Sequence, residues 1–153
     1  MAITRIDAVI DALVAALRAD PSLSGVTVLD GPPVTDDPLW EVVSIGFAWD
    51  AEDDRAAETT QGYHELGMTA KRDETVDVYC AVRVVNGDAD VSGARARAVV
   101  LLGAVEAVLR ADPSLGLADL LRCEVTVGDL RQTQTGDGVG ALIRFTVTAT
   151  ALI

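Results

Sequence analysis

Catalytic chemistry in this sequence would have to start from His64, the only histidine among the 153 residues. Tyr63 and Glu65 flank it, so a phenol, an imidazole and a carboxylate lie in succession. A nucleophile also needs an activating base that a third group orients, and the chain has no Gly-x-Ser-x-Gly elbow and no base near either cysteine. We therefore expect no catalytic residue. A small acidic enzyme or ligand-binding protein that uses His64 is kept as an alternative.

Metal binding would have to use a short acidic segment of the chain. Its carboxylates are Asp50, Glu52, Asp53 and Asp54. A calcium loop of the EF-hand type needs a glycine at its sixth position and a glutamate at its twelfth, and this segment has neither. A run of like charges is typically a solvated loop. The sequence therefore predicts no metal site here.

The sequence contains no cofactor-binding motif either. The glycine-rich run 136–140 contains Asp137 and lies between two expected strands, so it offers phosphates no helix N-terminus. Cys80 and Cys123 lie far apart without a CxxC or histidine partner, which predicts two buried free thiols. We expect no cofactor.

Protein–protein contact is the chemistry that the remaining residues favour. Trp40 is the aromatic anchor candidate, because aromatic side chains are enriched in the buried centres of interfaces, whereas we expect Trp49 in the core. Two polar segments are further contact candidates, the acidic loop and the residues before the Asp137-Gly138 turn. The candidate interaction residues are Trp40, Asp50, Glu52, Asp53, Asp54, Arg55, Glu58, His64, Arg131, Gln132 and Gln134.

Charge limits the partners. The formal net charge is -12, with 12 basic and 24 acidic residues, and most of the excess lies in the first half of the chain. Phosphate backbones are bound through Lys and Arg, so nucleic acid is an unfavourable direct ligand. We also expect no membrane span and no signal peptide. With 50% hydrophobic residues, residues 1–153 suffice for a single domain with its own core.

Two helices are expected from the hydrophobic spacing. Residues 4–19 form one amphipathic pattern, and a second pattern starts near Asp90 or Ser92 and continues to residue 111. Each pattern ends at an Asp-Pro pair within the same string, Leu-Arg-Ala-Asp-Pro-Ser-Leu.

Strands are expected wherever hydrophobic residues alternate with polar ones. The expected ranges are 25–29, 40–49, 74–85, 121–127 and 139–153. Residues 50–73 follow neither period and are expected to be a long, extended or mobile acidic loop, in which a short hairpin over 61–70 is one alternative. This order predicts an α+β fold: a single mixed, largely antiparallel β-sheet, two α-helices packed on one face, a long loop between central strands and a C-terminal β-hairpin.

The order of these elements resembles the tail-terminator, or tail-completion, proteins of long-tailed phages and prophages. The resemblance lies in the helix of residues 1–13, the Val26-Thr-Val-Leu-Asp-Gly-Pro-Pro segment, the strand that begins at Glu74, the helix 92–111 and the strand that begins at Ala141. The resemblance spans nearly the whole chain and lies in the pattern and order of the elements. The family has no catalytic signature that could be compared.

The resemblance implies a structural virion protein, formed in the host cytoplasm and placed at the head-proximal end of the tail. Its implied partners are further copies of itself in a hexameric ring, the major tail-tube protein and the head–tail connector protein. Genome DNA would only pass through the lumen, and acidic walls would keep it from sticking. A head–tail connector or neck subunit is the nearest alternative role.

Overall fold

The computed structural model describes residues 2–63, 71–136 and 138–153. These residues form two α-helices, one short 3-10 turn and six strands in a single sheet. In chain order the elements are α1 (Ile6–Ala19), the turn η1 (Pro21–Leu23), β1 (Thr27–Asp30), β2 (Glu41–Ile45), β3 (Ala57–Tyr63), β4 (Arg72–Asn86), α2 (Val91–Ala111), β5 (Leu120–Thr135) and β6 (Gly138–Leu152).

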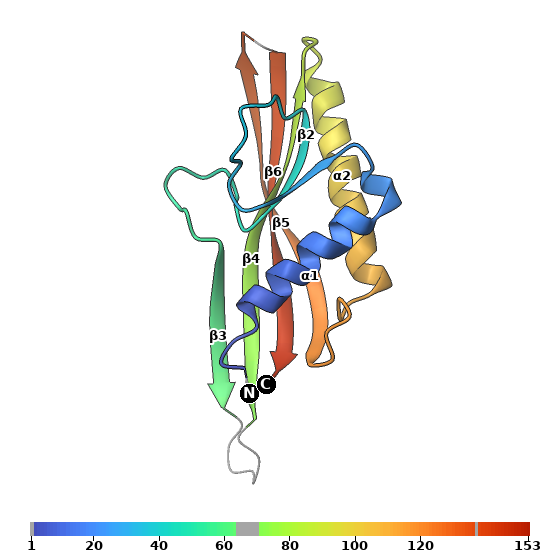
Figure 1. The fold of residues 1–153 in the computed structure, drawn as a ribbon. Helices are drawn as coiled ribbons and strands as arrows, with labels where there is room; N and C mark the ends of the chain where they lie inside the picture. Colours follow the sequence, from blue (N-terminus) through green and yellow to red (C-terminus); the bar gives the residue numbers. More distant parts are fainter. Residues whose placement is uncertain (1, 64–70, 137) are drawn as a thin grey trace.

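The sheet is mixed and largely antiparallel, which confirms the expected fold class (Figure 1). Its strand order is β1-β2-β4-β6-β5, and only the pair β1–β2 is parallel. The strands β2 and β3 follow one another along the same edge of β4: β2 pairs with residues 80–84 and β3 with residues 72–78. The long strands β4, β5 and β6 therefore form the frame to which the other strands attach.

The core lies between one face of this sheet and the two helices. In β4 the side chains of Val76, Val78, Cys80 and Val82 are all fully buried on that face, as the alternation predicts. The helices contribute the apolar stripes that their spacing predicts: Val9, Leu13 and Leu17 from α1, and Ala94, Ala98, Leu101, Val105 and Leu109 from α2. The side chain of Asp90 caps α2 by accepting a hydrogen bond from the Gly93 amide at 2.9 Å.

One carboxylate continues the buried row of β4. Glu74 is fully buried and accepts hydrogen bonds from the hydroxyl of Thr4, the amide of Arg5 (2.9 Å), the hydroxyl of Thr59 (2.8 Å) and the Nε2 of Gln61 (3.4 Å). Arg5 is the N-cap residue of α1, so an anion sits at the positive end of that helix. Burial raises the pKa of Glu74, but the four hydrogen bonds outweigh burial, and the net pKa lies below its ordinary value of 4.5. Glu74 thereby joins α1, β3 and β4.

The expected loop over residues 50–73 is wrong in its second half. Residues 57–63 form β3, an edge strand paired with β4, and β4 already begins at Arg72. Residues 58–63 of β3 are all exposed, so the strand carries no alternation of apolar and polar residues. The alternative hairpin over 61–70 falls largely outside the described residues.

The expected strand 40–49 ends early, and the expected burial of Trp49 in the core is also corrected. Gly46 has φ +74° and Trp49 has φ +55°, so the chain turns after Ile45 and returns over the face of the sheet opposite the helices. Trp49 is half-buried on that face, where its ring lies 5.0 Å from the ring of Phe47. Its Nε1 donates to the Ser44 hydroxyl at 3.1 Å.

Candidate interaction surface

Three arginines gather on the sheet face opposite the helices, although the chain as a whole is acidic. Arg83 on β4 and Arg144 on β6 belong to the polar faces of the two strands that cross the middle of the sheet. Together with Trp49 and Arg131 they line a groove of about 370 Å³, whose floor is formed by Leu142 and its neighbours on β6. Three guanidinium groups thus gather in a protein whose net charge is -12.

The Arg83 guanidinium stacks on a ring instead of pairing with an acid. It lies 4.8 Å from the centroid of the Trp49 ring, a cation–π contact, and no carboxylate among the described residues pairs with it. Partial burial lowers its pKa, although an arginine stays charged at any physiological pH. The groove therefore offers one cation that a carboxylate from outside the molecule could neutralise.

Arg144 holds the loop between β2 and β3 onto the sheet. Its Nε donates to the carbonyl of Ala48 and its Nη2 to the carbonyl of Trp49, both at 2.8 Å. A third contact joins its Nη1 to Asp129 at 3.5 Å. Because Arg144 is 16% exposed and satisfied by these acceptors, we read it as a residue that positions Trp49 and not as a free binding group.

Trp40, the predicted aromatic contact residue, lies beside this groove. Its side chain is 52% exposed and forms a second groove of about 410 Å³ with Pro38, Leu39, Arg83 and Val85. The two grooves share Arg83, so the structure brings the predicted residues Trp40 and Arg131 onto one continuous surface.

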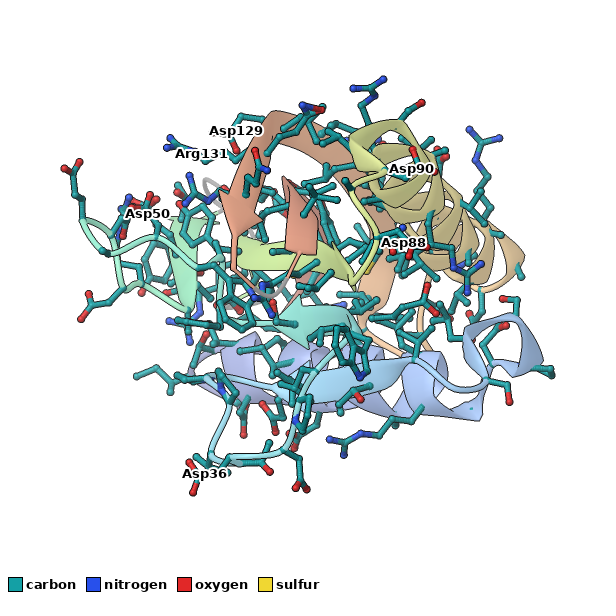
Figure 2. The ribbon with its side chains drawn as sticks, turned by 90° about the horizontal axis from the view of Figure 1, so that it is seen from above. Asp36, Asp50, Asp88, Asp90, Asp129 and Arg131 are labelled. Atoms are coloured by element: carbon teal, nitrogen blue, oxygen red, sulfur yellow. The ribbon has the colours of Figure 1, made fainter. Side chains whose placement is uncertain are left out.

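The acidic residues Asp50, Glu52, Asp53 and Asp54 directly follow Trp49, which lines the groove. Figure 2 shows Asp50 on the side of the molecule away from Asp88 and Asp90, which precede α2. Within the described residues, no group of three His, Cys, Asp or Glu side chains has an arrangement that could hold a metal ion.

Arg55 organises the end of that loop. It donates to both oxygens of Asp53, pairs with Glu58 at 3.3 Å and lies 5.4 Å over the Tyr79 ring. The hydrogen bonds from Arg55 lower the pKa of Asp53 to about 2. The pKa of Tyr79 is raised, first by its hydrogen bond to Glu58. Glu52 and Asp54 are exposed, and no described cation pairs with either.

The polar residues 131–134 belong to β5, so the expected strand 121–127 is corrected to a longer one. Arg131, Gln132 and Gln134 pair through their backbones with β6. Arg131 points to the grooved face and contacts Asp129 at 3.1 Å, whereas Gln132 points to the helix face and accepts from Arg95 at 2.8 Å. These neighbours therefore serve two different surfaces. His64 lies outside the described residues.

Sequence reasoning missed Arg83 and Arg144 as members of a site. The available signal was their place on the polar face of strands whose other face is fully buried. What the sequence could not supply was the register that sets Arg83 opposite Leu142 and Ala81 opposite Arg144.

Both cysteines are free and buried, as expected. Burial raises the pKa of Cys80 to about 12 and that of Cys123 to about 11.

Among the described residues, neither helix has the length and apolar character that a membrane span requires.

No family model matches the sequence, and no curated protein matches it. Among solved structures, the fold is similar to that of a chain in the virion of a native gene transfer agent particle. The TM-score is 0.58 with 18% sequence identity, and the similarity covers 94% of each chain. The two chains therefore share one fold over nearly their whole lengths.

Proposed function

We propose that this chain is a structural virion protein of the tailed-phage type and, within that class, the tail terminator. Six copies form a ring that caps the tail tube, stops the addition of tube protein and then presents a surface to the head–tail connector. The chain performs no catalysis in this role. Assembly takes place in the host cytoplasm, and the ring stays in the virion.

The observation that carries this proposal is the full-length similarity of the fold to a virion chain of a gene transfer agent particle. Because the match leaves almost none of either chain uncovered, it concerns the whole architecture and not one common motif. The order of helices and strands that resembles the tail-terminator family supports the narrower role.

The surface chemistry is consistent with an assembly subunit. Contact surfaces are offered by the exposed Trp40, by the two grooves that share Arg83 and by the long polar face of the sheet. Viewed along the strands, Asp36 and Asp50 lie at two different sides of the molecule (Figure 2). Carboxylates that line a ring would repel DNA and let a genome pass without binding it.

The test combines native mass spectrometry with electron microscopy of negatively stained samples. Purified chain is measured at low and high concentration, alone and with the major tail-tube protein of the same virion. We expect six-fold rings, and tubes that stop growing once a ring occupies one end. Tube protein alone is the control and should keep elongating.

Other outcomes separate the roles. A ring that binds the connector protein but leaves tube growth unchanged would replace the terminator with the neck-subunit role. A monomer or dimer that binds neither protein would refute both structural roles.

A further inference from the structure

One apolar patch lies where α2 borders the outer strand β5. The side chains of Val99 on α2 and of Val127 and Leu130 on β5 are 57%, 59% and 45% exposed. Val127 and Leu130 pair with Phe145 and Ile143 of the core row, so both belong to the helix face of the sheet. We call Val99, Val127 and Leu130 the valine–leucine patch.

Contacts on both sides place Val99 next to the two β5 residues. At one end Arg95 donates to Gln132 at 2.8 Å, and at the other end Glu106 and Arg110 share a groove with residues 123–126 of β5. The helix and the strand run in opposite directions here. Val99 therefore lies between these contacts on α2, as Val127 and Leu130 do on β5.

The patch also has a spare positive charge. Among the described residues the neutral Gln132 is the partner of Arg95, and no carboxylate pairs with it. The nearby acids pair with other cations: Glu106 pairs with Arg110 at 2.9 Å, and Asp129 pairs with Arg131 at 3.1 Å. A partner for this patch would combine apolar side chains with unpaired acids.

The loop before β2 has that composition. In residues 31–40, Val34 is 99% exposed and Trp40 is 52% exposed, and Pro38 and Leu39 complete an apolar groove beside Trp40. The loop contains Asp36 and Asp37 and no basic residue, and no described cation pairs with either acid. We call residues 31–40 the tryptophan loop.

The two surfaces lie on opposite sides of the molecule. Figure 2 shows Asp36 of the tryptophan loop on the side of the molecule opposite to Asp129 and Arg131 of β5, the strand that carries Val127 and Leu130. Within the sheet, β5 and the β1–β2 pair likewise occupy opposite edges. Two different, complementary surfaces on opposite sides are the requirement for a head-to-tail contact that closes into a ring.

We propose that the tryptophan loop of one copy docks on the valine–leucine patch of the next copy. Trp40 and Leu39 cover Val99, Val127 and Leu130, while Asp36 or Asp37 neutralises Arg95. This interface rests on the ring of the proposed function and names the surfaces that close it.

A pair of matched variants tests the patch. Val99 and Val100 have the same exposure, 57%, but Val100 faces away from β5 because it lies 100° further around the helix. Val99→Asp should weaken ring assembly at least tenfold in midpoint concentration, which is about 1.4 kcal/mol, since it removes an apolar contact of the interface and places a carboxylate that competes with Asp36 and Asp37 for Arg95. Val100→Asp should assemble like the wild type. Equal urea midpoints for the two variants would exclude a folding defect.

Charge reversal tests the ion pair. Arg95→Asp alone and Asp36→Arg/Asp37→Arg alone should each reduce assembly, and the combined variant should recover a large part of it. A combined variant that is as weak as, or weaker than, each parent would refute the pairing.

Cysteine cross-linking tests the direction of the contact. A Leu39→Cys/Leu130→Cys variant should form a ladder of disulfide-linked species up to the full ring, whereas each single variant should not cross-link. A mixture of the two single variants should stop at dimers. The buried native thiols, with raised pKa values, do not compete.

The outcomes distinguish the interface from the ring. If the wild type forms rings and Val99→Asp forms them equally well, the interface is wrong and the tail-terminator role stands. If the wild type forms no ring with or without tube protein, the proposed function fails first. Cross-linking of a single variant to itself would indicate a two-fold contact and overturn the head-to-tail arrangement.

Discussion

Glu74 should stabilise the fold strongly through its charge, and its replacement by glutamine tests that directly. The side chain is fully buried and accepts four hydrogen bonds, and no cation of the described residues pairs with it. Glu74→Gln keeps its size but removes the charge. The amide can still accept from the fixed N–H of Arg5, while the hydroxyls of Thr4 and Thr59 can rotate to accept from its NH₂ group.

The expected loss follows from what the charge contributes. Hydrogen bonds to a charged group stabilise by about 1.5–3 kcal/mol and neutral ones by about 1 kcal/mol. A carboxylate at a helix N-terminus adds about 0.5–1 kcal/mol. We therefore expect Glu74→Gln to lower the free energy of unfolding by about 2 kcal/mol. Glu74→Leu should lower it by about 4 kcal/mol, because it leaves the Arg5 amide without an acceptor.

Urea unfolding measures these differences. For a domain of this size, 2 kcal/mol corresponds to a midpoint shift of about 1 M. The exposed Glu52 is the matched control, and Glu52→Gln should stay within about 0.5 kcal/mol of the wild type.

The pH dependence gives a second readout. The pKa of Glu74 is lower in the folded than in the unfolded chain, so its stabilisation is complete above the ordinary value of 4.5 and is lost as pH falls through the folded pKa. The difference between wild type and Glu74→Gln should therefore be constant from pH 7 to about 5 and shrink below about 4.5. A difference below 0.5 kcal/mol at pH 7, or one that grows with acidity, would refute the assigned role of Glu74.

Further predictions concern the opposite face and the thiols. Arg144→Ala should release the loop that Arg144 holds through its hydrogen bonds to the carbonyls of Ala48 and Trp49. The tryptophan emission should shift to the red, and the free energy of unfolding in urea should fall by about 2 kcal/mol. Unchanged emission would contradict this role of Arg144. Cys80 and Cys123 should not react with a thiol reagent at pH 8 until the chain unfolds, because burial raises both pKa values. Fast labelling of the folded protein would contradict their burial.

Much of the fold was predictable because its main elements carry strong local patterns. The helices bury stripes at helical spacing and end at Asp-Pro, and β4 and β6 alternate apolar and polar residues over most of their lengths. Each pattern arises because one face of the element is buried, and such a pattern can be detected in a single sequence.

The missed elements bury almost nothing. Strand β3 is exposed at nearly every position, and the second half of β5, residues 128–134, is exposed too. Both exist because a neighbouring strand, β4 or β6, supplies backbone partners, and a backbone pairing leaves no hydrophobic period in the sequence.

The candidate surface depended on contacts between distant segments. Trp40 and Arg131 were predicted as contact residues from their types, but Arg83 joins them only through the register of β4 against β2 and β6. The expected burial of Trp49 failed because a turn at Gly46 reverses the chain, which strand periodicity cannot anticipate.

The two ends of the chain lie together at one pole of the molecule, opposite the β5–β6 hairpin (Figure 1). Arg72 exchanges backbone hydrogen bonds of 2.7 and 2.9 Å with Ile153, and its guanidinium donates to the carbonyl of Ile3 at 3.0 Å. A short linker could therefore join the ends, and a circular permutant reopened elsewhere should retain the fold. A tag, or a fluorescent protein fused at either end, would project from this pole alone. In an assembled ring, every such fusion would decorate a single rim, which makes the polarity of the ring on its tube directly visible by electron microscopy.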